Sequence, residues 1–243
     1  MTIADINTEA RALVDADTTS YTAALLLIRV NTAYEKVVAK ILGCDGRWQF
    51  DDTNYTSFPI ATTTLVNSQP DYTFDTAHLK IERVEVMDAN GNYYPLEPID
   101  LDDLGGIAPT EFHETDGRPY YYDKQGNSLV LYPAPDNGVS VTLSAGLKVF
   151  FQRTADTFTS AQVSTGTKVP GFASPFHHVL AYMAALPYAM SYKKDRVPMI
   201  LDEIKKVMGD EERKVTGTLE KFYGKRQKDE RQILSVAPPP AFY

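Results

Sequence analysis

Two helices are predicted at the start of the chain from the spacing of its apolar residues. Across residues 23–42, apolar side chains recur every three or four positions, which places them on one face of an α-helix. Thr19 or Ser20 is the expected cap at the start of this helix, and Gly43 is the glycine expected to end it. A shorter helix is expected before it, at about residues 5–15.

A region of strands and turns is predicted from Trp48 onward. Apolar and charged residues alternate most clearly in 79–87, and Asn90-Gly91 then favours the positive φ angles of a tight hairpin. The turn of a second hairpin is expected at Asp123–Asn127, and the polar residues 154–168 are expected to form a loop. The expected strands are 60–66, 79–87, 93–96, 120–122 and 128–132, and residues 139–151 are expected to form a further strand pair or one long strand.

Helical spacing returns towards the C-terminus. Pro175 suits the first turn of a helix over residues 175–193, which is apolar on nearly every side and is therefore expected to be buried. Pro187 predicts a kink within this helix. An amphipathic helix is expected over residues 198–223, and Gly224 is the residue expected to end it.

The fold class predicted from this order of elements is α+β. Residues 1–47 and 171–224 are expected to form a mainly helical bundle, because neither helical end can bury its apolar stripe alone. Residues 48–170 are expected to form an inserted antiparallel β module. Residues 225–243 are expected to form an extended C-terminal tail, since three consecutive prolines continue neither a helix nor a sheet.

The end of this tail is the one candidate binding site that the sequence offers. Its apolar residues cannot bury one another, and its prolines favour an extended form that suits a groove on another subunit, with the two terminal aromatic rings inserted. Basic residues before it, Lys225, Arg226, Lys228 and Arg231, favour an acidic partner surface. The candidate partner-binding residues are Ile233, Leu234, Val236, Pro238, Pro239, Pro240, Phe242 and Tyr243.

The charge of the chain is uneven and bears on its partners. The net charge is −8; residues 1–190 carry 12 Lys and Arg against 23 Asp and Glu, whereas residues 191–243 carry 12 against 9. A general nucleic-acid-binding protein needs a basic face to neutralise phosphates, so the acidic body argues against that class. The single cysteine, Cys44, excludes an internal disulfide and fits a reducing compartment. No apolar run has the length of a membrane span and no secretory signal is recognisable, so we expect no membrane association.

Catalytic, metal-binding and cofactor-binding patterns are absent from the sequence, so we expect no enzyme and no bound metal or cofactor. His177 and His178 are neighbours on one helix and point about 100° apart, which prevents them from sharing a ligand. His78 and His113 have no partner at the spacing of metal ligands. A nucleophile elbow and the glycine-rich phosphate loops are also missing.

One acidic segment partly matches a calcium-binding loop. Asp100, Asp102, Gly105 and Glu111 occupy four of the template positions, but Leu104 offers no oxygen where the template needs a ligand. No helix is expected to lead into the segment, so an acidic surface loop is favoured over a cation site. A hydrolase with a dispersed acidic site also stays open, and abundant Asp and Glu are its sole support.

Segments spread over residues 20–195 resemble the head–tail adaptor, or connector, proteins of tailed bacteriophages. None of these segments is a catalytic motif, and the resemblance lies in their order and spacing. The segments are Asn31–Val38, Gly46–Asp52, Leu79–Val84, Gly126–Pro135, Phe150–Arg153, Lys168–Phe172 and His177–Tyr182.

The resemblance implies a structural virion protein of the phage neck. Its implied partners are the portal protein, further neck or tail proteins, and copies of itself in a ring, typically twelve. Genomic DNA would pass through the ring without specific binding, which an acidic channel wall would favour by repelling phosphates. The implied location is the virion, with assembly in the host cytoplasm. The alternative is a β-rich virion module that binds a receptor or carbohydrate, indicated by the hairpins and by Tyr120–Tyr122.

Overall fold

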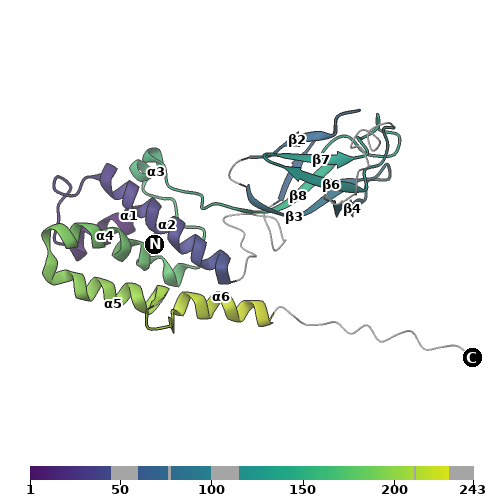
Figure 1. Cartoon of the computed structure of the whole chain (residues 1–243). Helices are drawn as coiled ribbons and strands as arrows, with labels where there is room; N and C mark the ends of the chain where they lie inside the picture. Colours follow the sequence, from purple (N-terminus) through teal and green to yellow (C-terminus); the bar gives the residue numbers. More distant parts are fainter. Residues whose placement is uncertain (45–59, 76–77, 100–114, 211, 230–243) are drawn as a thin grey trace, which may run out of the picture. The chain divides into compact units, whose positions relative to one another are not determined.

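The computed structural model describes residues 1–44, 60–75, 78–99, 115–210 and 212–229. The chain divides into two compact units: a helical unit made of Met1–Gly46 and Ala155–Tyr243, and a β unit made of Arg47–Thr154 (Figure 1). Helices and sheets are both present, which confirms the predicted α+β class.

The elements of each unit follow one another along the chain. The helical unit contains α1 (Ile3–Leu13), α2 (Ala23–Cys44), α3 (Ser160–Thr165), η3 (Ser174–Phe176), α4 (His178–Tyr192), η4 (Lys194–Arg196), α5 (Val197–Met208), β9 (Gly209–Asp210), β10 (Val215–Thr216) and α6 (Thr218–Asp229). The β unit contains β1 (Ile60–Thr63), β2 (Asp71–Thr73), β3 (His78–Met87), β4 (Tyr93–Pro95), β5 (Glu97–Pro98), β6 (Tyr121–Gln125), β7 (Ser128–Tyr132) and β8 (Leu147–Arg153).

The ends of α2 differ from those expected. The Thr22 hydroxyl accepts a backbone N–H of the first turn at 3.4 Å, so the expected caps Thr19 and Ser20 were wrong. Ser20 instead donates its hydroxyl to the Asp17 carboxylate in the turn before the helix. Because α2 continues to Cys44, Gly43 lies inside its last turn and does not end it.

Helix α4 packs against α1, α2 and α5. Small side chains on α4 let the neighbouring helices approach closely, and Pro187 lies within the helix. Tyr21, which precedes α2, donates its hydroxyl to the Ala184 carbonyl at 2.6 Å across 163 positions of sequence, and its ring stacks on Tyr188 at 4.8 Å. The buried residues of α4 are Val179, Leu180, Ala181, Ala184, Ala185 and Ala189.

The chain between β8 and α4 belongs to the helical unit, which begins again at Ala155 and not at the expected residue 171. The Asn31 side chain donates to the Phe158 carbonyl and accepts from the Phe158 N–H, both at 2.9 Å. The Tyr34 hydroxyl accepts from the Gly171 N–H at 2.7 Å. The expected loop 154–168 contains α3, which Thr159 and Gln162 cap reciprocally, a pattern that its polar composition concealed.

The helix expected over residues 198–223 is two helices joined by a tight ribbon. Strands β9 and β10 pair antiparallel between α5 and α6, and Gly209 adopts a φ of +91°, which ends α5. A Cβ atom added at Gly217 would overlap the Val207 carbonyl oxygen, so the crossing of the two strands needs glycine there. Helix α6 continues through Gly224, and the expectation that Gly224 ends the helix was therefore wrong.

The β unit consists of two four-stranded sheets around one apolar core. The first sheet has the order β1-β8-β3-β4 and the second the order β2-β7-β6-β5. All pairs are antiparallel except β5 with β6. The core draws from both sheets and their connections, and its buried members are Leu65, Tyr72, Val84, Val86, Leu96, Leu129, Leu131, Val141, Leu147 and Val149.

Both expected hairpins are present. The turn of the first lies between Met87 and Tyr93 as expected, and the turn of the second is shorter than expected. Strands β3 and β4 pair as expected. The Asp88 carboxylate accepts from the Asn92 N–H and also from the Asn90 N–H, and these hydrogen bonds lower the pKa of Asp88. The second hairpin closes with two residues, because β6 extends to Gln125. The strand pair or long strand expected over 139–151 is β8 alone, which begins at Leu147. Before it, Val141 forms an isolated bridge with Asp88, the residue after β3.

Replacing Gly217 with alanine is expected to destabilise the helical unit by about 1–3 kcal/mol, because the new methyl group meets backbone atoms that cannot move aside. Denaturant unfolding measures the change. Gly224→Ala is the matched control, since open space surrounds that position within α6, and its expected effect stays within about 1 kcal/mol. Equal stability of the two variants would contradict the close approach of Gly217 to the Val207 backbone.

Replacing Tyr21 with phenylalanine is expected to lower the free energy of unfolding by about 1 kcal/mol near neutral pH, because the Ala184 carbonyl loses its donor. Burial raises the pKa of Tyr21 from 10.0 to about 12, so the hydroxyl contribution is complete below pH 10 and is lost as the pH rises through about 12. Unfolding curves across this range should show the difference between the two proteins shrinking. A pH-independent difference would contradict it, and Tyr192→Phe, at a side chain 72% exposed, is the control.

Candidate interaction surfaces

The candidate partner-binding residues of the C-terminal tail, from Ile233 to Tyr243, lie outside the described residues. The beginning of the expected tail is described and differs from the expectation, because α6 continues to Asp229. Residues 225–229 are therefore helical and not extended. The calcium-like acidic segment 100–111 also lies outside the described residues.

The one histidine buried in the helical unit is used to hold its fold together. The exposed fraction of His177 is 1%, and its Nε2 lies 2.7 Å from the Phe172 carbonyl oxygen. Its Nδ1 lies 3.1 Å from the amino group of Met1. His178 points elsewhere, with its Nε2 3.8 Å from a Glu203 carboxylate oxygen. Within the part of the chain that the structure describes, no three His, Cys, Asp or Glu side chains gather as metal ligands.

Some tyrosine side chains of the β unit make structural contacts, and others are exposed to solvent. The Arg118 guanidinium lies over the Tyr94 ring at 3.7 Å, and the Tyr94 hydroxyl donates to the Pro119 carbonyl at 3.0 Å. Burial raises the pKa of Tyr94 to about 12. In contrast, the exposed fractions of Tyr120 and Tyr121 are 57% and 38%. These two rings are therefore available to a ligand or partner.

Several exposed apolar side chains occur towards the end of α4 and the start of α5. Tyr188, stacked on buried Tyr21, also contacts Tyr192 at a ring distance of 4.8 Å. Met190 and Met199 are exposed on α4 and α5. Apolar and aromatic side chains of this kind are enriched at protein interfaces, so this end of the helical unit is suited to contact another subunit.

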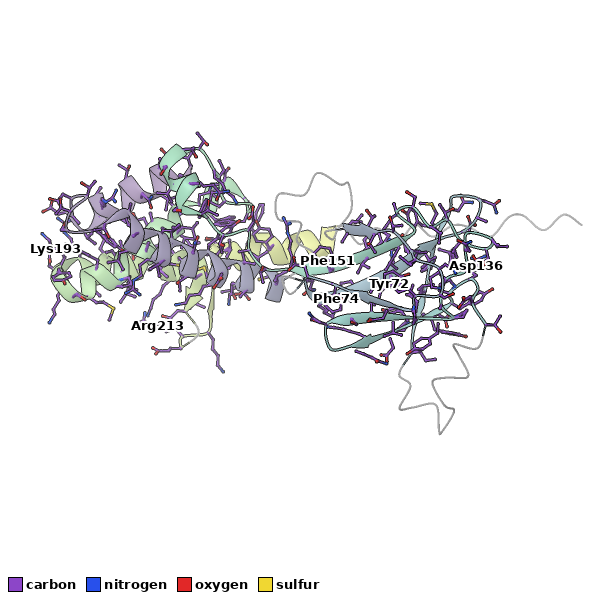
Figure 2. The ribbon with its side chains drawn as sticks, turned by 90° about the horizontal axis from the view of Figure 1, so that it is seen from above. Tyr72, Phe74, Asp136, Phe151, Lys193 and Arg213 are labelled. Carbon is purple, nitrogen blue, oxygen red and sulfur yellow. The ribbon has the colours of Figure 1, made fainter. Side chains whose placement is uncertain are left out.

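The ribbon of β9 and β10 is a second exposed feature of the helical unit. Asp210 holds its base, with Lys205 at 2.9 Å from the Asp210 carboxylate, and this hydrogen bond lowers the pKa of Asp210. Arg213 extends outward from the ribbon, and half of the Val215 surface is exposed (Figure 2). The ribbon therefore presents both apolar and basic groups on a rigid base.

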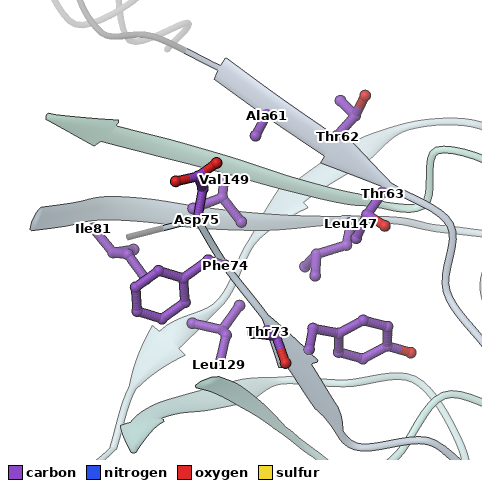
Figure 3. A pocket seen from close by; sticks show the side chains of 11 residues that line it. Ala61, Thr62, Thr63, Thr73, Phe74, Asp75, Ile81, Leu129, Leu147 and Val149 are labelled. Atoms are coloured by element: carbon purple, nitrogen blue, oxygen red, sulfur yellow. The ribbon is translucent and has the colours of Figure 1, made fainter. Parts of the chain in front are cut away.

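The β unit has an apolar cavity of about 130 Å³ between the edge strands β1 and β2 (Figure 3). Side chains from both sheets form it, so it lies at the open side of the core. The polar side chains among its lining residues are three threonines, Asp75 and Tyr72. The lining residues are Ala61, Thr62, Thr63, Tyr72, Thr73, Phe74, Asp75, Ile81, Leu129, Leu147 and Val149.

The ribbon and the cavity are the two surfaces that sequence reasoning missed. Gly209 and Gly217 signalled the ribbon, since two glycines within a supposed helix are costly and mark a break. No local signal announces the cavity, because it depends on which strands of the two sheets become neighbouring edges.

Comparison with known families gives the chain its identity. The family of the SU10 adaptor protein matches residues 1–232, which include all described elements of both units. No curated protein matches the sequence. Among the described helices, none is long and apolar enough to cross a membrane. The resemblance to phage adaptors is therefore confirmed, and the chain belongs to the SU10 adaptor protein family, a structural head–tail adaptor family of bacteriophages.

Proposed function

We propose that copies of this protein form a ring in the virion neck that joins the portal protein to further neck or tail proteins. The observation that carries the proposal is membership of the SU10 adaptor protein family over residues 1–232. A ring of about twelve copies is what the resemblance to phage adaptors implies, and a head-to-tail interface whose rotation closes gives a cyclic oligomer. Assembly takes place in the host cytoplasm before the particle is complete.

The exposed groups of the helical unit support a role in assembly. The aromatic pair Tyr188 and Tyr192 and the exposed Met190 offer apolar contact area, and the ribbon offers Val215 beside basic side chains. A ring subunit needs at least two different contact surfaces, since each copy touches a neighbour on either side and the portal or tail besides. These two features supply such surfaces on one compact unit.

The acidic body of the chain supports passage of DNA without binding. Residues 1–190 carry 12 basic against 23 acidic side chains, which repel phosphates along a channel wall. Catalysis is not part of the proposed function. The buried histidine is engaged at both ring nitrogens, and the described carboxylates with lowered pKa values, such as Asp88 and Asp210, accept hydrogen bonds that stabilise turns.

A receptor- or carbohydrate-binding module is the second candidate, and the exposed rings of Tyr120 and Tyr121 favour it. Flat aromatic rings at the surface are suited to stack on sugars. The family membership favours the adaptor, because the match over residues 1–232 includes all the described helices and not the β unit alone. Binding of host-cell glycans by the isolated protein would instead favour the second candidate.

The C-terminal segment is proposed to strengthen attachment to another subunit. A chain ending at Gln232 is expected to keep its fold, because the described helices end at Asp229, and to associate about tenfold or more weakly with the portal. Native mass spectrometry of the portal with full-length and shortened chains measures the association, and thermal unfolding provides the control for folding. Equal association of both chains would contradict a role for the segment, whereas no association of the full chain would contradict the adaptor itself.

Duplex DNA is expected to bind the isolated protein only weakly, with a shallow dependence on salt. A steep decrease in affinity with salt requires many cationic contacts to phosphates, which the acidic body does not offer. Fluorescence anisotropy of labelled duplex DNA over a series of salt concentrations measures this dependence. Tight binding that weakens steeply with salt would contradict passage without binding.

A further inference from the structure

The two sides of the β unit differ in how their edge strands are protected. Edge strands β4 and β5 carry Pro95 and Pro98, and proline prevents further pairing because it lacks an N–H group. Edge strand β1 has the sequence Ile-Ala-Thr-Thr, with neither proline nor charge. Among the described residues, β1 pairs with β8 alone, so one row of its backbone groups faces away from the sheet.

The apolar cavity lies beside this unprotected edge. Ile81, Leu129, Leu147 and Val149 line it from both sheets, and Ala61 of β1 lies at its rim. Its volume of about 130 Å³ is close to that of a protein cavity of about 150 Å³ that holds a benzene molecule. An unprotected edge beside a hole for one apolar side chain is the arrangement by which sheets bind an added strand.

The chain contains a short segment with the matching chemistry. Residues 233–236 read Ile-Leu-Ser-Val, which equals the four residues of β1 in length, and Pro238 then stops further pairing. In an extended conformation Leu234 and Val236 share one face, so both can be directed at the cavity. Arg231 precedes the segment, and two exposed carboxylates, Asp71 in β2 and Asp75 just after it, give complementary charge.

We propose that residues 233–236 of one copy add as a strand to β1 of a second copy, with an apolar side chain in the cavity between β1 and β2. This proposal rests on the proposed ring, since it names the surface that receives the C-terminal segment. Added backbone hydrogen bonds supply affinity, and the cavity selects Leu234 or Val236. The proline-protected edge at β4 and β5 stays unpaired, so each β unit receives one segment.

Hydrogen exchange of the full chain tests the pairing. The variant carrying Leu234→Asp and Val236→Asp is expected to lose protection at the amides of β1, because a charge is not tolerated in an apolar cavity. Ser235→Asp is the matched control, since it places one charge on the opposite face of the segment and should retain protection. Unchanged protection of β1 in the double variant would overturn the proposal.

Disulfide formation between two chains tests whether the segment comes from a second copy. Both chains carry Cys44→Ser; one adds Ala61→Cys and the other Leu234→Cys. Mixed oxidation is expected to give a covalent dimer of the two, as directly opposed residues of paired strands are close. Val139→Cys in place of Ala61→Cys is the control, since that side chain is 81% exposed in the same unit and does not line the cavity. A dimer no more abundant than in the control would overturn donation between copies.

Portal association of the wild-type chain, measured beside β1 exchange in the double variant, separates this proposal from the proposed function. If wild-type chain joins the portal and β1 exchange is unaffected by Leu234→Asp with Val236→Asp, strand addition fails and the adaptor stands. If β1 loses protection in that variant but the wild-type chain never joins the portal, strand addition stands and the proposed function fails.

Discussion

The helical unit depends on covering α4 with helices from both ends of the chain. Helix α4 is rich in alanine and apolar on nearly every side, and α1, α2 and α5 pack against it. The hydrogen bond from Tyr21 to the Ala184 carbonyl and the stacking on Tyr188 fix the N-terminal part on this helix. The helices that pack together come from the two ends of the chain, and the β unit is inserted between them as one continuous stretch.

Polar side chains in this unit hold irregular backbone in place. Asn31 and Tyr34 of α2 bind the segment that leads to α4, and the Tyr223 hydroxyl accepts from the Ala173 N–H at 3.0 Å. His177 serves the same purpose against Phe172. His177, although histidine is a common catalytic residue type, thus pairs with a backbone oxygen that burial would otherwise leave without a partner.

Much of the fold could be predicted from the sequence, and the failures have physical causes. Periodic apolar spacing identified α2, Pro175 and the apolar run after it identified α4, and Asn90-Gly91 identified the first hairpin, because these signals are local. The break at Gly209 was missed because the apolar stripe resumes in phase beyond it. The cavity could not be predicted, since it arises where edges of two separate sheets meet. The expected tail residues 233–243 stay a prediction, because the structure does not describe them.

The division of the chain has a consequence for synthesis on the ribosome. The β unit is one continuous stretch, so all its strands are available for pairing as soon as Thr154 has emerged. Helices α1 and α2 must wait for α4 to α6, which are made last, before their apolar faces are covered. A prematurely terminated chain would therefore contain a foldable β unit beside two unfinished helices. Such a product lacks the completed helical unit, so incomplete subunits would be poor competitors for places in the proposed ring.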